Sequence, residues 1–274
     1  MSKIYNSGET EEELRNKYNP EGSERRIAQK KLLEMLIWFD NVCKENNIQY
    51  YLSDGALLGA YRHKGFIPWD DDIDVSILRK EYKKLKKILE SDKYKSAQYV
   101  LQTHKSDKGF FGFYPVLRDT KSEYILDSII HKERKYRGLQ IDIFTYNDNI
   151  IHVLQKFCYF FERVNIKFFI GRHKILATIC YWIECLIIIP FSRFISLLNF
   201  NHKYIQNDYA CYWTYKYLEK EIFPLKTIEF EGYSFPCPGN LNYYLEKTYG
   251  KNYMELPNIN DRDNHKIIEI KYFI

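Results

Sequence analysis

Residues 70–74 read Asp-Asp-Asp-Ile-Asp, so four carboxylates fall within five consecutive positions. Like charges this close repel one another, so the segment either faces water as a loop or surrounds a cation. From Asp72 onward the acids alternate with Ile73 and Val75, which predicts a strand with one apolar face. Asp72 and Asp74 then point to the same side of the sheet, where a divalent cation would offset their repulsion.

A third carboxylate is expected from a neighbouring strand. Asp142 stands between Ile141 and Ile143 in an otherwise apolar run, so it is the best candidate to complete a metal site with the first pair. Asp70 and Asp71 precede the strand and are interpreted either as a solvated turn or as charges just outside the metal ligands. They are therefore left out of the expected metal site.

A glycine-punctuated stretch lies just before the acids. Gly55 follows a short apolar strand and opens a predicted short helix, and a helix start of this kind presents backbone N–H groups to an anion. Arg62 and Lys64 are expected to help hold the phosphates of a nucleotide. His63 has two open interpretations, a hydrogen bond to phosphate or a structural role. A phosphate-binding turn close to paired acids is the layout of a nucleotidyltransferase-type active site.

Composition sets broad limits on the chain. With 274 residues, 45% hydrophobic residues and a net charge of +5, it is expected to be globular, and the mild charge permits a phosphate or an anionic membrane as partner. Nucleic acid is not expected among its partners. Six cysteines without a C-x-x-C pair are expected to be reduced. The acidic first residues show no apolar signal segment, which predicts a cytoplasmic protein.

The order of the expected elements predicts an α+β fold, in which helices flank a mixed sheet that encloses the acidic site. We expect an acidic N-terminal tail over 1–22, a catalytic core over 23–150, an apolar and basic helical segment over 151–210, and a C-terminal part over 211–274 that packs on the core. Strands are expected near 48–53, 73–78, 98–104, 109–119 and 138–147, and helices near 23–45, 55–65, 79–91 and 241–249.

The segment 151–210 has two open interpretations. Its most apolar part, 175–191, is interrupted by one glutamate and one proline, whereas a membrane-spanning helix needs about 20 apolar residues. It is either one of a buried pair of helices that caps the domain, or an interfacial or re-entrant helix. In the second case Arg172, Lys174 and Arg193 flank it and would contact an anionic membrane.

The motifs together resemble a known family. The stretch YYLSDGALLGAYRHKGFIPWDDDIDVSILRKEYKKL closely resembles the signature of the LicD family of phosphocholine and related phospho-polyol transferases. That family is related to fukutin and the fukutin-related protein, and it belongs to the nucleotidyltransferase-fold superfamily. GLQIDIFTYN resembles its second acidic strand, and IFPLKTIEFEGYSFPCPGNLNYYLEKTYGKNYMELP resembles its C-terminal block. The resemblance covers residues 25–265 and is weakest over 151–210.

The resemblance implies that Asp72, Asp74 and Asp142 are the catalytic, metal-binding acids. It places the glycine-rich turn of the family at Ser53, Asp54 and Gly55.

The chain departs from the family pattern in three places. Asp54, Gly55 and Ala56 stand where many members carry two glycines and a threonine. Val116 replaces a frequent lysine and leaves Arg118 as the nearest cation, and Thr145 replaces a frequent proline. None of these changes affects the acids. They bear on which phosphate donor fits.

The resemblance also implies a reaction. Mg²⁺ or Mn²⁺ would be the cofactor, and CDP-choline or a related CDP-alcohol would be the donor. The acceptor would be a hydroxyl of a glycan that is attached to a lipid carrier. The protein would contact the inner face of the cell membrane peripherally. The product would belong to lipopolysaccharide, capsule or teichoic acid. Two alternatives stay open: transfer of a nucleotide to a small molecule or protein, and a catalytically inactive, metal-binding member of the family.

Trp69 and two late residues complete the expectations for the site. Trp69 would either stack on a base or sugar or serve as a structural anchor. Arg262 and His265 would help to shape the site.

Overall fold

The computed structural model describes residues 4–95, 98–112, 114–126, 129–168, 170, 172–199, 202–209, 215–262 and 267–273. His265 and Cys211 lie outside these ranges. The other five cysteines are all free thiols, as expected.

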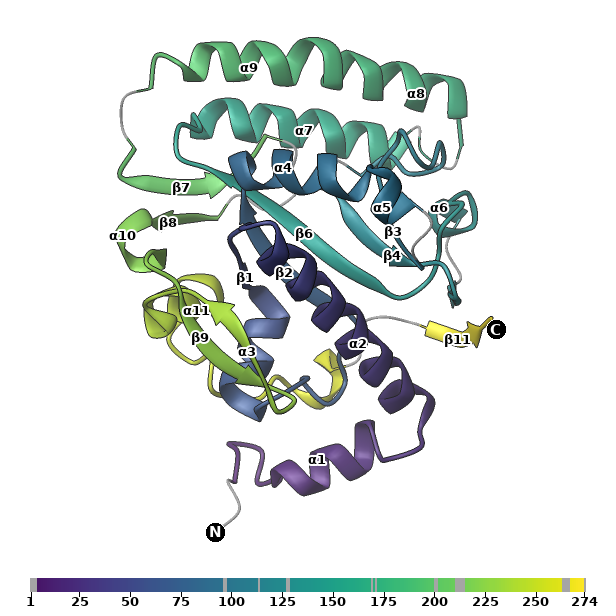
Figure 1. Cartoon of the computed structure of the whole chain (residues 1–274), viewed down its shortest axis with the longest axis vertical. Helices are drawn as coiled ribbons and strands as arrows, with labels where there is room; N and C mark the ends of the chain where they lie inside the picture. The colour runs from purple at the N-terminus through teal and green to yellow at the C-terminus, as the bar shows by residue number, and fades with distance from the viewer. Residues whose placement is uncertain are drawn as a thin grey trace.

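A mixed sheet forms the centre of the molecule (Figure 1). Its main path runs β1-β2-β6-β4-β3, and β7 and β8 extend it from the end of β6. β2 and β6 are parallel, whereas the other pairs are antiparallel. The strands are β1 (Tyr50–Leu52), β2 (Ile73–Leu78), β3 (Tyr99–Gln102), β4 (Val116–Asp119), β6 (Gln140–Asn147), β7 (Tyr204–Asn207) and β8 (Lys216–Leu218). The expected α+β fold with a mixed sheet is confirmed.

Two small antiparallel pairs lie outside this sheet. β9 (Lys226–Phe230) and β10 (Tyr233–Cys237) form a hairpin, and β5 (Ser122–Leu126) pairs with β11 (Ile267–Tyr272) near the C-terminus. The sequence predicted neither pair.

Helices cover both faces of the sheet (Figure 1). α2 (Glu24–Glu45) and α4 (Arg79–Leu89) cover one face, and α3 (Asp54–His63) and α11 (Leu241–Tyr249) lie toward the other. At one end α7 (His152–Phe168) packs against a long helix made of α8 (Lys174–Ile183), the π-turn η1 (Glu184–Ile188) and α9 (Ile189–Ser196). The shorter helices are α1 (Glu11–Tyr18), α5 (Asp92–Lys95), α6 (Ile129–Lys132), α10 (Glu219–Ile222) and the 3₁₀ turn η2 (Ile259–Asp261).

α2 shows why the core forms where it does. Ser23 is its N-cap, and the side-chain oxygen of Ser23 accepts a hydrogen bond from the N–H of Arg26. One stripe of α2, including Leu32, Leu36 and Phe39, is completely buried against the apolar side of the sheet. Burial of this stripe fixes the other side of the sheet as the one that carries the acids.

Two expectations about elements need correction. The stretch expected as an acidic tail contains α1, which a capping box of Thr10 and Glu13 starts and which buries Leu14. The aromatic run at Phe110 and Phe111 is not part of a strand, because both rings are buried in loop structure before β4 begins.

α3 contains a glycine that its close packing requires. A Cβ on Gly59 would lie 2.5 Å from the carbonyl oxygen of Gly65 and 3.1 Å from the backbone nitrogen of Ile67. Both are backbone atoms, so they cannot move aside as a flexible side chain would.

We therefore expect Gly59→Ala to lower the free energy of unfolding by about 1–3 kcal/mol, the usual cost of overpacking. In an unobstructed helix the same change stabilises by about 1 kcal/mol, so the sign of the effect is the test. Urea unfolding followed by circular dichroism measures it. A variant more stable than the wild type would contradict the close packing.

Candidate active site

Three of the predicted acids meet at the starts of the two parallel strands. Asp74 in β2 is in register with Asp142 in β6, and Asp72 immediately precedes β2. Carboxylate oxygens of the three residues all lie within 4.8 Å of one another. The alternation of apolar and acidic residues causes this arrangement, since Ile73 and Val75 are fully buried on the opposite face.

Mutual repulsion is the main electrostatic property of this cluster. Burial raises the pKa of Asp74 well above its ordinary value, and the charges of Asp72, Asp54, Asp142 and Asp70 raise it further. A hard divalent cation such as Mg²⁺ prefers carboxylate oxygens and would remove this repulsion. The donor set therefore fits such an ion.

Asp70 also lies at this site, although its position in a turn had suggested otherwise. It forms a second group of close carboxylates with Asp71 and Asp72, again with oxygens within 4.8 Å of one another. Its Oδ2 atom lies 2.9 Å from the point where a Cβ on Gly55 would be. The run of four aspartates in the sequence hinted that Asp70 belongs to the site. Its position in the cluster nevertheless depends on the packing of α3 against the turn.

The turn before α3 contacts the acids directly. The backbone N–H of Gly55 donates a hydrogen bond to Oδ2 of Asp74 at 2.9 Å, and the N–H of the buried N-cap Ser53 donates to the carbonyl of Asp74 at 3.1 Å. Asp54 has a φ of +41°, an uncommon value for a residue with a side chain. Burial raises the pKa of Asp54 to about 6, and the charge of Asp72 adds to this shift. Phosphate binding by Ser53 and Gly55 stays a prediction.

Two arginines supply positive charge near Asp142. Arg118 lies on the same sheet face as Asp142, because it pairs with Gln140 in the ladder between β4 and β6. Its guanidinium is buried, and it donates to Oε1 of Gln102 at 2.6 Å and to the carbonyl of Gly138 at 2.8 Å. Burial lowers the pKa of Arg118 to about 10, whereas the charge of Asp142 opposes this shift.

The second arginine, Arg134, was missed because it lies in an irregular segment without a motif. Its guanidinium carbon is 5.2 Å from the centre of the Phe110 ring, and its buried Nε atom has no hydrogen-bond partner among the described residues. Burial lowers the pKa of Arg134, while Tyr114 and Asp142 act in the opposite direction. Val116 faces Asp142 in the ladder between β4 and β6, so this position brings no charge to the acid.

The other basic candidates belong to a structural network. Nη1 of Arg62 donates to the carbonyls of Tyr253 and Glu255, and its Nε donates to Nε2 of His63 at 2.9 Å. The opposite ring nitrogen of His63 therefore carries the proton that it donates to Oε2 of Glu11 at 2.6 Å. Burial lowers the pKa of His63, which favours this neutral form.

This geometry favours a structural role for Arg62 and His63. Lys64 is the left-handed C-cap of α3 and is exposed. Phosphate binding by these three residues stays a prediction.

Trp69 is an anchor between layers. Its ring packs edge-on to Tyr18, with the ring centres 5.2 Å apart, and the guanidinium carbon of Arg262 lies 5.1 Å from the centre of the Trp69 ring. Nη1 of Arg262 also pairs with Glu9 at 2.8 Å. Both residues thus fasten the N-terminal segment beside the acidic turn.

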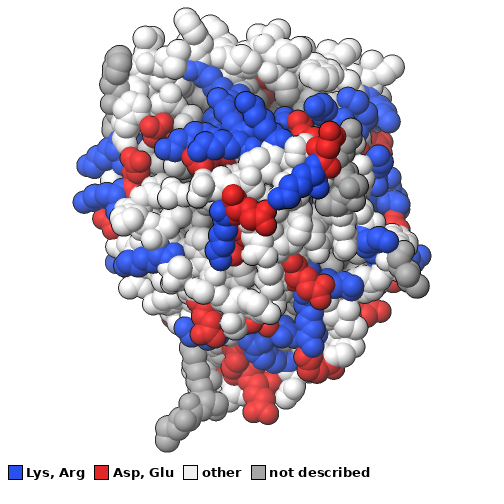
Figure 2. Space-filling view, in the orientation of Figure 1, with Lys and Arg blue, Asp and Glu red and all other residues white. Residues whose placement is uncertain are grey.

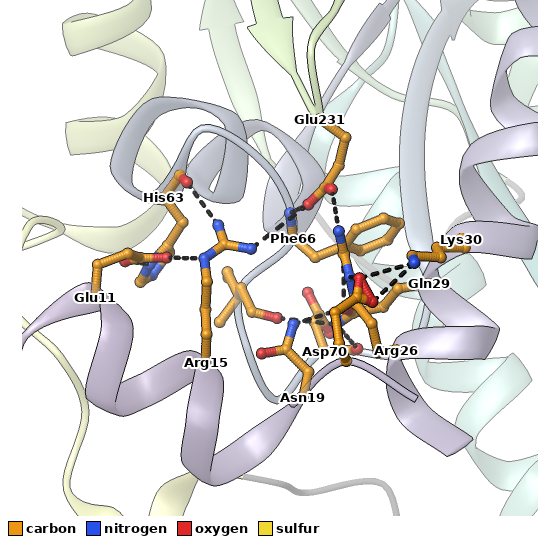
Figure 3. Close-up of polar contacts among 12 residues, drawn as sticks. Glu11, Arg15, Asn19, Arg26, Gln29, Lys30, His63, Phe66, Asp70 and Glu231 are labelled. Carbon is orange, nitrogen blue, oxygen red and sulfur yellow. Dashed lines mark hydrogen bonds and ion pairs between the residues drawn. The ribbon is translucent and has the colours of Figure 1, made fainter. Parts of the chain in front are cut away.

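The loop that leads to the acids is clamped from the β9–β10 turn (Figure 3). Glu231 accepts hydrogen bonds from Nη2 of Arg26 at 2.7 Å and from the N–H of Phe66 at 3.2 Å, and Nη1 of Arg15 lies 3.9 Å away. A Cβ on Gly65 would lie 2.1 Å from Oε1 of Glu231, so a larger residue there would displace this carboxylate. We call these contacts the Glu231 clamp. They join the β9–β10 turn to α1, to α2 and to the loop that leads to the acidic run.

Known proteins resemble this chain in sequence. A family model described as "LicD/FKTN/FKRP, nucleotidyltransferase domain" matches residues 47–169. The chain is 30% identical over 260 residues to the lipopolysaccharide cholinephosphotransferase LicD of Haemophilus influenzae, an alignment that covers 86% of this chain and 94% of that protein. It is also 30% identical over 122 residues to an uncharacterized protein of Rickettsia prowazekii, covering 39% of this chain and 46% of that protein.

We expect Glu231→Ala to lower the free energy of unfolding by about 2 kcal/mol, because it removes charge-assisted hydrogen bonds from a largely buried site. Thermal and urea unfolding measure the loss. Glu229→Ala is the matched control, since Glu229 is exposed on the same hairpin. Equal stability of the two variants would show that the clamp does not hold the loop.

Gly55→Ala tests the contact between the turn and the acids. A methyl group there would push on Asp70 and Asp74, so we expect Mn²⁺ affinity to fall about tenfold or more, as when other groups that orient metal ligands are changed. Electron paramagnetic resonance of Mn²⁺ measures the affinity. Ala56→Gly, which removes a methyl one position on, should leave it unchanged, and an unaltered affinity in Gly55→Ala would contradict the geometry.

Proposed function

Because this chain belongs to the LicD family, we propose that it is a phosphotransferase that moves a phospho-alcohol, phosphocholine first among the candidates, from a CDP-alcohol to a hydroxyl of a cell-surface glycan. The name of the Haemophilus relative supports phosphocholine as the group and lipopolysaccharide as the acceptor. CDP-choline is the corresponding donor.

One observation carries the proposal. Asp72, Asp74 and Asp142 converge from two adjacent parallel strands, with carboxylate oxygens within 4.8 Å of one another. Such a cluster is unfavourable without a counterion and favourable around Mg²⁺ or Mn²⁺. When bound, the ion would neutralise the diphosphate and stabilise the CMP that leaves.

The side chains around the cluster would do the remaining work. The acceptor oxygen forms a bond to the phosphorus that carries the alcohol, while the bond from that phosphorus to the oxygen of CMP breaks. Asp142 would either complete the metal site or take the proton of the acceptor hydroxyl. Arg118 and Arg134 would offset phosphate charge beside it. The N–H groups of Ser53 and Gly55 bond to Asp74, so this turn would act by holding that acid in place.

Nucleotidyl transfer is the second candidate, since the description of the matching domain names this chemistry. It would use the same acids but release pyrophosphate instead of CMP. A catalytically inactive, metal-binding member of the family would release neither product. The products therefore separate the three functions.

The proposed place of the reaction is the cytoplasm, at the inner face of the cell membrane. The helix Lys174–Ser196 supports membrane contact, because it is long and apolar enough to cross a membrane by length and composition, and only 22% of its most apolar window is buried. A lipid-linked glycan acceptor would be met there.

The decisive experiment is release of CMP from CDP-choline, CDP-glycerol and CDP-ribitol, with Mg²⁺ and a lipopolysaccharide acceptor. We expect release from one donor, and we expect Asp72→Asn to lower the rate about 10³-fold because it removes a charged metal ligand. EDTA should abolish the reaction, and excess Mg²⁺ should restore it.

Asp92→Asn is the matched control, since Asp92 is exposed and begins α5. Release of pyrophosphate from a nucleoside triphosphate, without CMP from any donor, would replace the proposal by nucleotidyl transfer. The absence of both products would indicate a catalytically inactive, metal-binding member of the family.

A further inference from the structure

The long helix of α8, η1 and α9 exposes an apolar face that the rest of the chain leaves uncovered. It spans 23 residues with a mean hydropathy of 2.0 in its most apolar window, of which 22% is buried. We use the term apolar face for the large apolar side chains that this helix and the two residues after it expose. They are Ile175, Leu176, Ile179, Trp182, Ile183, Leu186, Ile187, Phe191, Phe194, Leu197 and Leu198. Exposed apolar surface of this extent marks an interaction site.

The opposite side of this helix is fastened to the protein. Oγ of Ser196 lies 2.6 Å from the hydroxyl of Tyr209, and Nη2 of Arg193 lies 2.9 Å from Asp208. Nδ2 of Asn165 in α7 donates to the carbonyl of Ala177 at 3.2 Å. The helix is thus held along its whole length, which fits a helix lying in the plane of a membrane surface better than one that crosses it.

A groove runs between this helix and α4. Its cavity volume is about 570 Å³, and its apolar lining includes Tyr82 on α4 and Tyr181, Cys185 and Ile189 on the long helix. Lys83, Lys86 and Lys87 line it from α4. Its two acids are both paired, Glu90 with Lys105 and Asp208 with Arg79 and Arg193. The groove therefore combines an apolar interior with a basic rim.

These lysines form no ion pair in the described part of the chain, although the charge of Lys83 acts on the pKa of Asp208. Lys84 on the same helix pairs with Glu81, and Arg79 pairs with Asp208, but Lys83, Lys86 and Lys87 form no ion pair with a described residue. Figure 2 shows Lys and Arg side chains gathered over α4. They lie beside an uncharged band at the end of the molecule where Figure 1 places α7, α8 and α9. A basic cluster beside an apolar face is the pattern that an anionic bilayer complements.

We propose that the protein docks flat on an anionic bilayer, with the phosphate headgroups of phospholipids in the groove between α4 and the long helix and with the apolar face in the hydrocarbon boundary. The anionic contact is thereby assigned to α4. Of the flanking residues expected to make it, Arg193 pairs with Asp208, whereas membrane contact by the exposed Arg172 and Lys174 stays a prediction. The proposal does not depend on the proposed reaction, since docking needs neither donor nor acceptor.

Vesicle flotation without nucleotide or glycan tests the proposal on the whole chain. We expect binding to vesicles of phosphatidylcholine and phosphatidylglycerol in equal parts, and little binding to pure phosphatidylcholine. Changing Lys83, Lys86 and Lys87 together to Glu should weaken binding about 100-fold or more, because each lysine near an anionic surface contributes to affinity.

The matched control changes Lys121, Lys226 and Lys251 to Glu. These lysines are exposed, lie away from α4 in the sequence, and alter the net charge equally. It should keep most of the binding. The double variant Leu186→Ser and Phe194→Ser should also lose binding, since both side chains are at least 66% exposed in the fold and need not disturb it. Circular dichroism melting of each variant verifies folding.

Two results would overturn the proposal. One is equal binding by the α4 triple variant and the control triple variant. The other is that the wild type forms a dimer, that the double variant Leu186→Ser and Phe194→Ser is a monomer, and that neither binds vesicles. The apolar face would then be an interface between two copies. Fluorescence of Trp182 provides a direct reading: docking should allow quenching by brominated lipids, which Trp182→Phe should reduce.

Discussion

The structure depends on the parallel pairing of β2 with β6, which sets Asp74 beside Asp142. Their charges oppose this pairing, and the burial of Ile73, Val75 and the apolar partners of β6 on the other face holds it. Hydrophobic burial on one side of the sheet thus maintains an electrostatically unfavourable cluster on the other. A bound cation would relieve this repulsion, as proposed above.

Contacts between distant segments hold the edges of this site. The turn at Ser53 and Gly55 contacts Asp74 through backbone N–H groups, and the Glu231 clamp fixes the loop that delivers the acidic run. At the end of α3, the hydrogen bond between Arg62 and His63 belongs to this set of structural contacts. The groove beside α4 opens on the opposite sheet face, so the proposed lipid contact and the acids are separate features linked through the rigid sheet.

Local patterns predicted the acids well, because alternation along a strand is decided by nearest neighbours. The same holds for α2, whose cap and stripe are both visible in the sequence. Arg134 and Asp70 were not recognised, since tertiary packing alone brings an irregular segment and a turn to the cluster. The Glu231 clamp spans 205 positions to Arg26, and no local pattern reports a contact of that range.

The most direct test of the central claim is a crystal structure of the protein with Mn²⁺, with anomalous diffraction data. We predict an anomalous peak about 2.0–2.2 Å from carboxylate oxygens of Asp72 and Asp74, with Asp142 at or next to the ion. The peak should disappear in Asp74→Asn crystals. A peak held by Asp70 and Asp71 alone, or no peak in this cluster at saturating Mn²⁺, would contradict the account.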